Sequence, residues 1–392
     1  ASFVEALGLA QDELAAAGLD VKIDERIVEH EDYKTKITLL IQQEGTSPDL
    51  FSYWEGARTQ FLADAGLLYD LSDYWAKHDV DTVLPASMKD AATYVVNGQE
   101  GIYNIPFVAH SAVVAYNPKI FAEAGVKPPK TWDEFLAVCD AIKALSTTTK
   151  PIYPLFTGVK YRWPAQFWFD YLLLRTAGFE FREALMRGEE SYTDYRVVRA
   201  FQMWADLLKK EYFLPGAAAY DWQEVLTFFL NGQGAMYLMG DWVFGDLKGM
   251  GLEPGVDYDY FEFPMIEPDV PQGLVGPIDG FCMPALSPNK KDAFEVLDQL
   301  LTDPVQELYA PAKGGLSVTR TAKPDFDVVM AKEVPMVANS PFYAFNYDLA
   351  TPPPVADVGL NAFVELWNNP DGYINILVKV QEKIGQENLF GE

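Results

Sequence analysis

The sequence is poor in the residues that most often serve metal binding and catalysis. It has two cysteines and three histidines among 392 residues, and it contains no HExxH or CxxC motif. A disulfide framework and the common zinc sites are therefore excluded, and we interpret Cys139 and Cys282 as small buried hydrophobic residues. A Walker lysine motif and a complete G-x-S-x-G nucleophile motif are also missing. We expect no metal and no cofactor.

Positive charge is scarce as well. The chain carries 57 acidic against 30 basic residues, which leaves a net charge of −27. Such a field repels phosphate backbones and anionic lipid headgroups, so we expect neither nucleic acid nor a membrane surface as a partner. No apolar run approaches the roughly 20 residues of a membrane span. With 49% hydrophobic residues the chain is globular, and its length predicts two or three domains or two large lobes.

Helical and extended patterns alternate along the chain, which favours an α/β fold with parallel sheets. Asn97-Gly98 between two apolar runs predicts a hairpin. Thr131 followed by Glu134 forms a capping box, and the Pro-rich residues 351–357 are expected to form a loop. We predict helices over residues 2–17, 58–75, 131–145, 165–178, 291–304, 359–369 and 373–385, and strands over 21–27, 48–54, 111–117, 235–240 and 280–288.

Aromatic residues are abundant, at 14% of the chain, and several lie beside polar residues at the predicted ends of strands and helices. In open α/β sheets, ligands bind beyond the carboxyl ends of strands. A flat ring can stack on the C–H face of a pyranose while charged neighbours bind its hydroxyl groups, so this pairing suits a sugar. The candidate ligand-binding residues are Trp54, Glu55, Arg58, His110, Arg162, Trp163, Asp241, Trp242, Asp279, Phe281, Tyr347 and Asp348.

Each candidate also has a structural interpretation. A tryptophan on a helical stripe, such as Trp204, is typical of a core, while Asp241 and Asp279 would serve equally as helix or turn caps. His110 alone would be typical of a buried structural histidine. The argument for a sugar site therefore rests on the whole set of residues.

Several segments, in order and in spacing, resemble the extracellular solute-binding proteins of ABC-type carbohydrate transporters, the group that includes maltose- and glucose-binding proteins. The resemblance runs across nearly the whole chain. The matching segments are Tyr33–Thr38 (YKTKIT), Ser47–Phe51 (SPDLF), Ala65–Leu68 (AGLL), Ile105–Phe107 (IPF), Ala115–Asn117 (AYN) with Phe121, Pro129–Phe135 (PKTWDEF), Asn231–Met236 (NGQGAM), Met239–Trp242 (MGDW) and Lys313–Ser317 (KGGLS).

The resemblance implies an α/β, two-lobed periplasmic-binding-protein-like fold (type II), with the ligand in a cleft between lobes that a hinge of crossing strands connects. We place the crossings near residues 109–115, 270–280 and 317–322. The lobes would then be residues 1–110 with 278–318, and residues 111–277 with 319–392. Carried over by position, Trp54, Asp241-Trp242 and Asp279-Phe281 line the cleft, with Trp163, His110 and Tyr347-Asp348 as further carry-overs.

The resemblance also implies the function. We expect a monomer that binds a mono- or oligosaccharide without chemical change, closes by hinge motion and delivers the sugar to the permease subunits of an ABC importer. Its location would be periplasmic or extracellular, either free or as a cell-surface lipoprotein. Two alternatives remain open: a carbohydrate-active hydrolase that uses two carboxylates, and the same fold with a non-sugar solute such as a polyamine.

Overall fold

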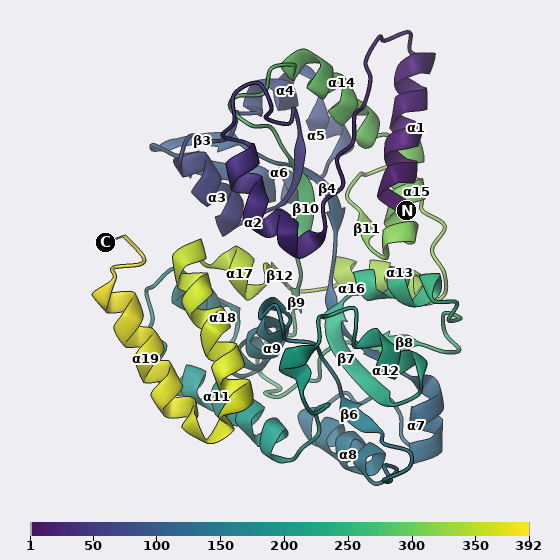
Figure 1. The fold of residues 1–392 in the computed structure, drawn as a ribbon, viewed down its shortest axis with the longest axis vertical. Coiled ribbons are helices and arrows are strands. Elements are labelled where there is room, and N and C mark those ends of the chain that lie inside the picture. Colours follow the sequence, from purple (N-terminus) through teal and green to yellow (C-terminus); the bar gives the residue numbers. More distant parts are fainter. Residues whose placement is uncertain (1, 392) are drawn as a thin grey trace. The chain divides into compact units, whose positions relative to one another are not determined.

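The computed structural model describes residues 2–391, which form two compact units (Figure 1). Unit 1 comprises Ala1–His110 and Pro277–Met330, and unit 2 comprises Ser111–Gly276 and Ala331–Glu392. The chain therefore passes between the units three times. Each unit is described below by itself.

The third passage follows Met330, beyond the boundary after residue 318 that we expected from the sequence. The intervening segment stays on unit 1 because the unit supplies its hydrogen bonds. The backbone N–H of Arg320 donates to the carbonyl of Val83 at 2.9 Å, and the Arg320 Nε donates to the carbonyl of Leu84 at 3.1 Å.

Unit 1 is built around an antiparallel sheet of order β1-β10-β4-β11. A separate hairpin, β2-β3, turns at Asn97-Gly98, where both residues have positive φ angles of 51° and 77°. The elements of unit 1 are α1 (Ser2–Ala16), α2 (His30–Leu40), β1 (Phe51–Trp54), α3 (Ala57–Asp64), α4 (Ser72–Lys77), α5 (Val80–Val83), α6 (Ala86–Ala92), β2 (Thr93–Val96), β3 (Gln99–Ile102), β4 (Ile105–Ala109), β10 (Ile278–Cys282), α14 (Lys290–Leu300), α15 (Asp303–Lys313) and β11 (Leu316–Ser317).

The core of unit 1 lies where α1, α14 and α15 cover this sheet. Buried side chains from segments far apart in the sequence meet there, among them Trp75, Phe107, Phe281 and Leu297. A smaller cluster around Phe51 and Leu62 packs α2 and α3 against β1. Strands β1 and β4 come from the first segment of the chain, and both pair with β10, which forms after the chain has returned to unit 1.

Unit 2 is built around a mixed sheet of order β6-β7-β5-β8, in which β6 and β7 are parallel and the other pairs are antiparallel. A short parallel pair, β9 and β12, lies apart from it. The elements are β5 (Ala112–Tyr116), α7 (Pro118–Ala124), α8 (Trp132–Lys143), β6 (Tyr153–Leu155), η1 (Trp163–Ala165), α9 (Gln166–Ala177), α10 (Phe179–Met186), α11 (Tyr195–Lys209), η2 (Ala217–Ala219), α12 (Leu226–Leu230), β7 (Gly234–Gly240), α13 (Trp242–Gly249), β8 (Asp259–Phe261), β9 (Leu274–Val275), α16 (Glu333–Ala338), β12 (Tyr343–Ala344), α17 (Tyr347–Ala350), α18 (Pro353–Asn368), η4 (Pro370–Gly372) and α19 (Tyr373–Gln386); η3 (Met330–Lys332) spans the last passage.

Helix α9 is the centre of unit 2 (Figure 1). Every residue from Gln166 to Arg175 is buried, as its apolar sequence predicted, and α9 packs against α11 and β7. The rings of Phe169, Phe201 and Phe363 meet at centroid distances of 4.9–6.0 Å and join α9, α11 and α18. The predicted capping box of α8 is present, with Thr131 and Glu134 in reciprocal contact with the backbone.

Two expectations about strands are wrong. Residues 21–27 form no strand, and Ile27 is 66% exposed, because no neighbouring strand pairs with this stretch. The sheets are also mainly antiparallel among the described residues, although strands and helices alternate in the sequence. Strand β10 enters between β1 and β4 from a distant part of the chain, so the order along the sequence does not give the order in the sheet.

Three helix boundaries also differ from expectation. The segment 58–75 breaks into α3 and α4 around Gly66, whose φ angle is 69°. The predicted loop 351–357 contains the start of α18. Proline is accommodated in the first helical turn because N–H groups in that turn have no acceptor within the helix, so the N–H that proline lacks is not needed there. A further helix, α15, follows α14 after a break at Leu301 and Thr302.

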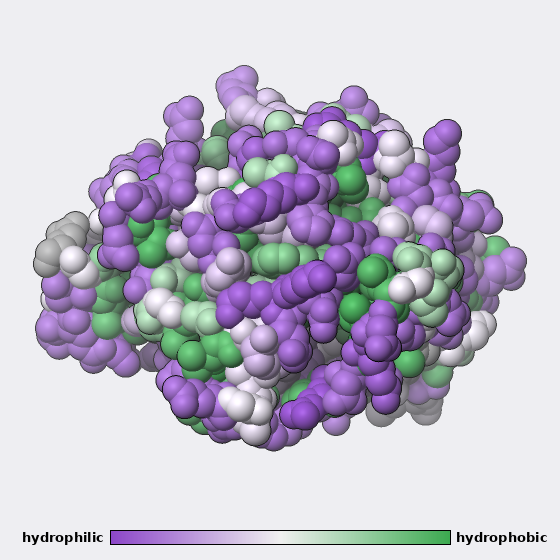
Figure 2. Space-filling view, turned by 90° about the horizontal axis from the view of Figure 1, so that it is seen from above, coloured by the Kyte–Doolittle hydropathy of each residue, from purple (hydrophilic) through white to green (hydrophobic). Residues whose placement is uncertain are grey.

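The surface is mainly hydrophilic on the face that Figure 2 draws, and hydrophobic residues appear there in small separate patches. Both cysteines are buried and unpaired, Cys282 in unit 1 and Cys139 in unit 2, as the sequence predicted. Within residues 2–391, no helix is long and apolar enough to cross a membrane.

Candidate functional site

In unit 1, Trp54 lies at the end of β1, opposite Asp279 on β10. Its half-buried indole is surrounded by polar and aromatic groups, which we call the Trp54 cluster. The His30 ring lies 5.7 Å from the indole centroid, the Lys34 ammonium 5.6 Å and the Arg58 guanidinium 5.8 Å. The indole thus combines an apolar face with nearby hydrogen-bond donors, which is the chemistry that a hydroxylated ring requires.

Glu55 lies beneath this cluster and is completely buried. It accepts a short hydrogen bond from the Tyr94 hydroxyl, which in turn accepts one from the Gly56 N–H at 2.9 Å. Burial raises the pKa of Glu55 well above its ordinary value. Its position indicates that it fixes the short connection between β1 and α3. Helix α3 carries Arg58.

His110 and Asp279 form a second polar pair in unit 1. The His110 Nε2 lies 3.8 Å from an Asp279 carboxylate oxygen. The His110 ring is buried against Gly315, where a Cβ atom would come within 2.5 Å of it, so only glycine fits there. Burial lowers the pKa of His110 to about 4, which leaves the imidazole neutral at neutral pH and able both to donate and to accept a hydrogen bond.

Phe281 does not lie beside His110 and Asp279. The register of β10 against β4 shifts between Asp279 and Gly280, which is the mark of a β-bulge. Past the shift, Phe281 points into the core of unit 1, where its ring lies 5.2 Å from that of Phe107. The structure therefore gives Phe281 a packing position and keeps Asp279 partly exposed.

Unit 2 holds a cluster of three indoles, which we call the tryptophan cluster. The ring centroid of Trp163 lies 6.1 Å from that of Trp242 and 6.0 Å from that of Trp222, and the latter two are 6.5 Å apart. The sequence pointed to Trp163 and Trp242 but not to Trp222. Gly240 permits this arrangement, since a Cβ atom there would come within 2.0 Å of the Trp242 ring. Trp222 and Trp242 stay half-buried, so part of their surface remains accessible.

Asp241 lies directly beside the tryptophan cluster, between β7 and α13. It is completely buried, and its carboxylate accepts a hydrogen bond from the Ser111 N–H at 3.0 Å. Its own N–H donates to the Ser111 carbonyl at 2.9 Å. The end of β7 and the start of β5 are thereby joined, and the carboxylate has a fixed orientation.

Arg162 precedes Trp163 and has a positive φ angle of 64°, which is rare for a residue with a side chain. Its guanidinium forms an ion pair with Asp357 at 2.7 Å and donates to Asn361 at 2.8 Å, both on α18. Arg162 thus attaches the loop that carries Trp163 to α18. These bonds explain how Trp163 is positioned, and a direct role of Arg162 in ligand binding stays a prediction.

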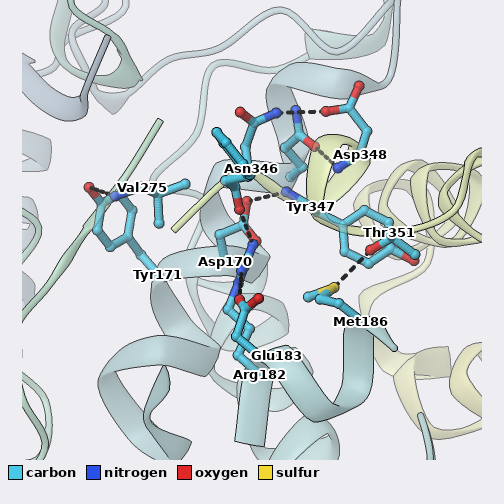
Figure 3. A network of polar contacts seen from close by, with 12 residues as sticks. Asp170, Tyr171, Arg182, Glu183, Met186, Val275, Asn346, Tyr347, Asp348 and Thr351 are labelled. Atoms are coloured by element: carbon cyan, nitrogen blue, oxygen red, sulfur yellow. Dashed lines mark hydrogen bonds and ion pairs between the residues drawn. The ribbon is translucent and has the colours of Figure 1, made fainter. Parts of the chain in front are cut away.

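Tyr347 and Asp348 lie at the start of α17 in a buried polar network (Figure 3). The Tyr347 hydroxyl lies 2.7 Å from that of Tyr192, and its backbone N–H donates to Asp170 at 3.0 Å. The Asp348 carboxylate accepts from Asn346 at 2.6 Å. The hydroxyl and the N–H of Tyr347 both have partners inside unit 2, so its place is structural.

The sequence analysis missed Trp222, His30 and Lys34. Trp222 follows a loop and lacks a conspicuous motif, although Asp221-Trp222 repeats the pairing of a carboxylate with an indole that pointed to Asp241-Trp242. His30 and Lys34 lie on α2, where i and i+4 positions share one face. Among the described residues, no group of three or more potential metal ligands is arranged to hold an ion.

Comparisons with known proteins agree with this architecture. Residues 2–307 match the family model of the bacterial extracellular solute-binding proteins. An uncharacterised ABC transporter extracellular-binding protein of Pyrococcus horikoshii is 29% identical over 72% of this chain and 60% of its own length. A probable sugar-binding periplasmic protein of Mesorhizobium japonicum is 27% identical over 68% of this chain. The match spans about 60% of the length of that relative as well.

Two solved structures share the fold over nearly the whole chain. The bacterial solute receptor AcbH, described as having an exclusive preference for β-D-galactopyranose, superimposes with a TM-score of 0.86 at 22% identity, over 98% of this chain and 96% of its own. A chitin oligosaccharide binding protein superimposes with a TM-score of 0.83 at 22% identity, over 100% of this chain and 95% of its own. At such identities the likeness establishes the fold.

Proposed function

This chain belongs to the family of bacterial extracellular solute-binding proteins, and we propose that it binds a mono- or oligosaccharide as the substrate-binding component of an ABC-type importer. The tryptophan cluster beside Asp241 is the observation that supports this proposal most directly. Indole faces pack on the C–H groups of a sugar ring, and a carboxylate of fixed orientation accepts hydrogen bonds from its hydroxyl groups. The Trp54 cluster of unit 1 supplies a second set of groups of the same chemistry.

The mechanism follows from how the candidate groups are divided. Trp54, Arg58, His110 and Asp279 belong to unit 1, whereas the tryptophan cluster and Asp241 belong to unit 2. A ligand that binds groups of both units stabilises the conformation in which the units close on it, by its difference in affinity for the two conformations. The loaded protein would then deliver the sugar, chemically unaltered, to the membrane-bound permease subunits.

The ligands of the two structural neighbours named above, a galactopyranose and a chitin oligosaccharide, support a saccharide and leave its length open. The test is a panel of galactose, glucose, maltose, xylobiose, chitobiose and spermidine, each added to the purified protein while its melting temperature and tryptophan fluorescence are recorded. We expect at least one saccharide to raise the melting temperature, because a ligand at 100 times its Kd stabilises the folded state by about 2.7 kcal/mol. Mass spectrometry should recover that saccharide intact.

Substitution of one indole makes the test specific. Trp242→Ala should weaken the affinity for the binding saccharide by about 1–3 kcal/mol through lost stacking area. Tyr195→Ala is the matched control, because Tyr195 is an aromatic residue of the same unit, outside the tryptophan cluster, that is 75% exposed. No response to any saccharide would overturn the proposal, a response to spermidine alone would favour a polyamine, and shortened products would favour a hydrolase.

A further inference from the structure

Glu333 is a buried acid whose environment differs from that of every other candidate group. It is the first residue of α16, just after the chain returns to unit 2, and its side chain has no exposed surface. Neither of its carboxyl oxygens meets a donor in good hydrogen-bond geometry among the described residues, and the Ser111 hydroxyl is the one neighbouring group that can turn to donate to it. The polar side chains that it faces are Asp241 and Ser111. An ionised carboxylate without donors would be costly in such a place.

Asp241 differs from Glu333 in this respect. The Ser111 N–H donates to Asp241, and this donor stabilises a negative charge on the aspartate. Two buried carboxyl groups in contact do not both ionise, because each charge opposes the other. The proton of such a pair therefore belongs on Glu333, the member that lacks a backbone N–H donor.

The other ionisable groups nearby do not supply a counter-charge to Glu333. Lys332 forms a short ion pair with Asp259 and lies 5.1 Å from the ring centroid of Tyr260 on β8. Burial raises the pKa of Tyr260, and the nearby carboxylates of Glu262, Asp259 and Asp241 raise it further. The surroundings of Glu333 on β7, β8 and its own helix thus favour its neutral form.

We infer that Glu333 is a neutral carboxylic acid at physiological pH, that it donates its proton to the Asp241 carboxylate, and that it thereby positions Asp241 for the ligand. The assignment to ligand binding rests on the proposed function; the protonation state does not. In agreement, burial raises the pKa of Glu333 well above its ordinary value, and the negative charge of Asp241 raises it further. Glu333 is accordingly a positioning residue that acts through Asp241.

Infrared spectroscopy tests the protonation state without a ligand. A protonated carboxylic acid has a C=O stretching band that carboxylates lack, and at pH 7 we expect Glu333→Gln to remove part of this band from the spectrum of the full chain. Glu262→Gln is the matched control, since Glu262 is an exposed glutamate next to β8. Other buried acids such as Glu55 contribute equally to all three spectra. An identical carboxylic-acid band in the wild type and in Glu333→Gln would overturn the inference.

Unfolding experiments test the positioning. An acid whose pKa is raised on folding stabilises the protein below its unfolded pKa, and this stability is lost as the pH rises through the folded pKa. Relative to Glu333→Gln, the wild-type unfolding constant should therefore rise by up to tenfold per pH unit from the ordinary glutamate pKa of 4.5 upward, until the raised pKa of the folded protein is passed. At pH 7, Glu333→Gln keeps a donor to Asp241 and takes up no proton on folding, so it should unfold no more easily than the wild type, whereas Glu333→Ala should unfold more easily than Glu333→Gln.

The saccharide that responds in the panel separates the two proposals. We expect Glu333→Ala to weaken its binding at least tenfold and Glu333→Gln to leave the binding within about twofold. If no saccharide binds but the infrared band behaves as expected, the proposed function fails and the proton assignment stands. If a saccharide binds and Glu333→Ala binds it as tightly as the wild type, the positioning role is refuted.

Discussion

Asp170 offers a sharp test of how unit 2 holds the segment that carries Asp348. Asp170 and Arg182 come from successive helices, α9 and α10, and both are completely buried (Figure 3). One Asp170 oxygen accepts two hydrogen bonds from the Arg182 guanidinium, at 2.5 and 3.1 Å, and the other accepts the Tyr347 N–H at 3.0 Å. Burial alone would lower the pKa of Arg182, but the charges and hydrogen bonds of Asp170 and Glu183 together outweigh burial and raise that pKa. Burial raises the pKa of Asp170 to about 6, which is still below 7, so the pair is ionised at pH 7.

The structure sets the size of the expected effect. In Asp170→Ala the Arg182 guanidinium keeps Glu183 at 2.7 Å and the Phe345 carbonyl at 2.6 Å, but it loses the one carboxylate that is as deeply buried as itself. The Tyr347 N–H loses its acceptor as well. Removing one partner of a buried pair costs about 3–5 kcal/mol, so we expect a loss of that size. Asp170→Asn keeps the shape and should cost about 2 kcal/mol through weaker hydrogen bonds.

The free energy of unfolding is measured by urea denaturation at pH 7, with amide hydrogen exchange to localise the effect. Exchange should become faster at the Tyr347 amide, because that amide loses its acceptor. The control is Glu189→Ala, which breaks the Arg187–Glu189 pair, whose side chains are 56% and 57% exposed. Such pairs contribute about 0–1 kcal/mol. If Asp170→Ala costs no more than Glu189→Ala, the buried network does not hold α17 in place.

Two further predictions concern unit 1. The pKa of His110 falls on folding from about 6.5 to about 4, so the stability that this residue confers above pH 6.5 is lost as the pH falls to 4. That loss should reach about 3 kcal/mol in urea unfolding and be absent in His110→Gln; equal pH profiles would contradict it. Gly280→Ala would place a Cβ atom 2.4 Å from the Ile105 carbonyl oxygen and should cost about 1–3 kcal/mol of stability. In Gly8→Ala the added Cβ meets no atom within 4 Å, so this variant should stabilise α1 by about 0.5–1 kcal/mol. Equal melting temperatures of the two variants would refute this prediction.

The features that could be predicted from the sequence depend on short-range interactions. The hairpin at Asn97-Gly98 requires two residues that tolerate positive φ, and the capping box at Thr131 requires a partner three residues away. The burial of α9 follows from apolar residues on all its sides. The failed strand at 21–27 has the alternation of a strand but no partner, and pairing is not encoded in the stretch itself.

The same limit applies to the sheets. Strand β10 lies between β1 and β4 although more than 160 residues separate it from either of them in the chain. The order of strands is decided by which surfaces pack once the chain has returned to unit 1, and local patterns carry no information about that return. Only the family resemblance supplied it, through the order of many weak motifs.

The candidate site shows why local chemistry separates ligand groups from packing groups poorly. Asp241-Trp242 and Tyr347-Asp348 are the same kind of pair in the sequence, an aromatic ring beside a carboxylate at the end of an element. The difference lies in distant partners. Around Tyr347, the helices α9 and α10 supply Asp170 and Arg182, which satisfy the polar groups internally and leave a ligand nothing to bind.

At Asp241, by contrast, the surroundings supply indoles whose faces stay partly accessible and a second acid, Glu333, that has no backbone N–H donor. A polar group beside an aromatic ring thus points to binding only where the fold leaves the ring some surface and holds the polar group in one orientation. Both conditions depend on residues about 90 positions or more away in the sequence, such as Ser111 and Glu333. The loss of saccharide binding in Glu333→Ala, set against its retention in Glu333→Gln, is therefore the most direct measure of whether this corner of unit 2 was shaped for a ligand or only for packing.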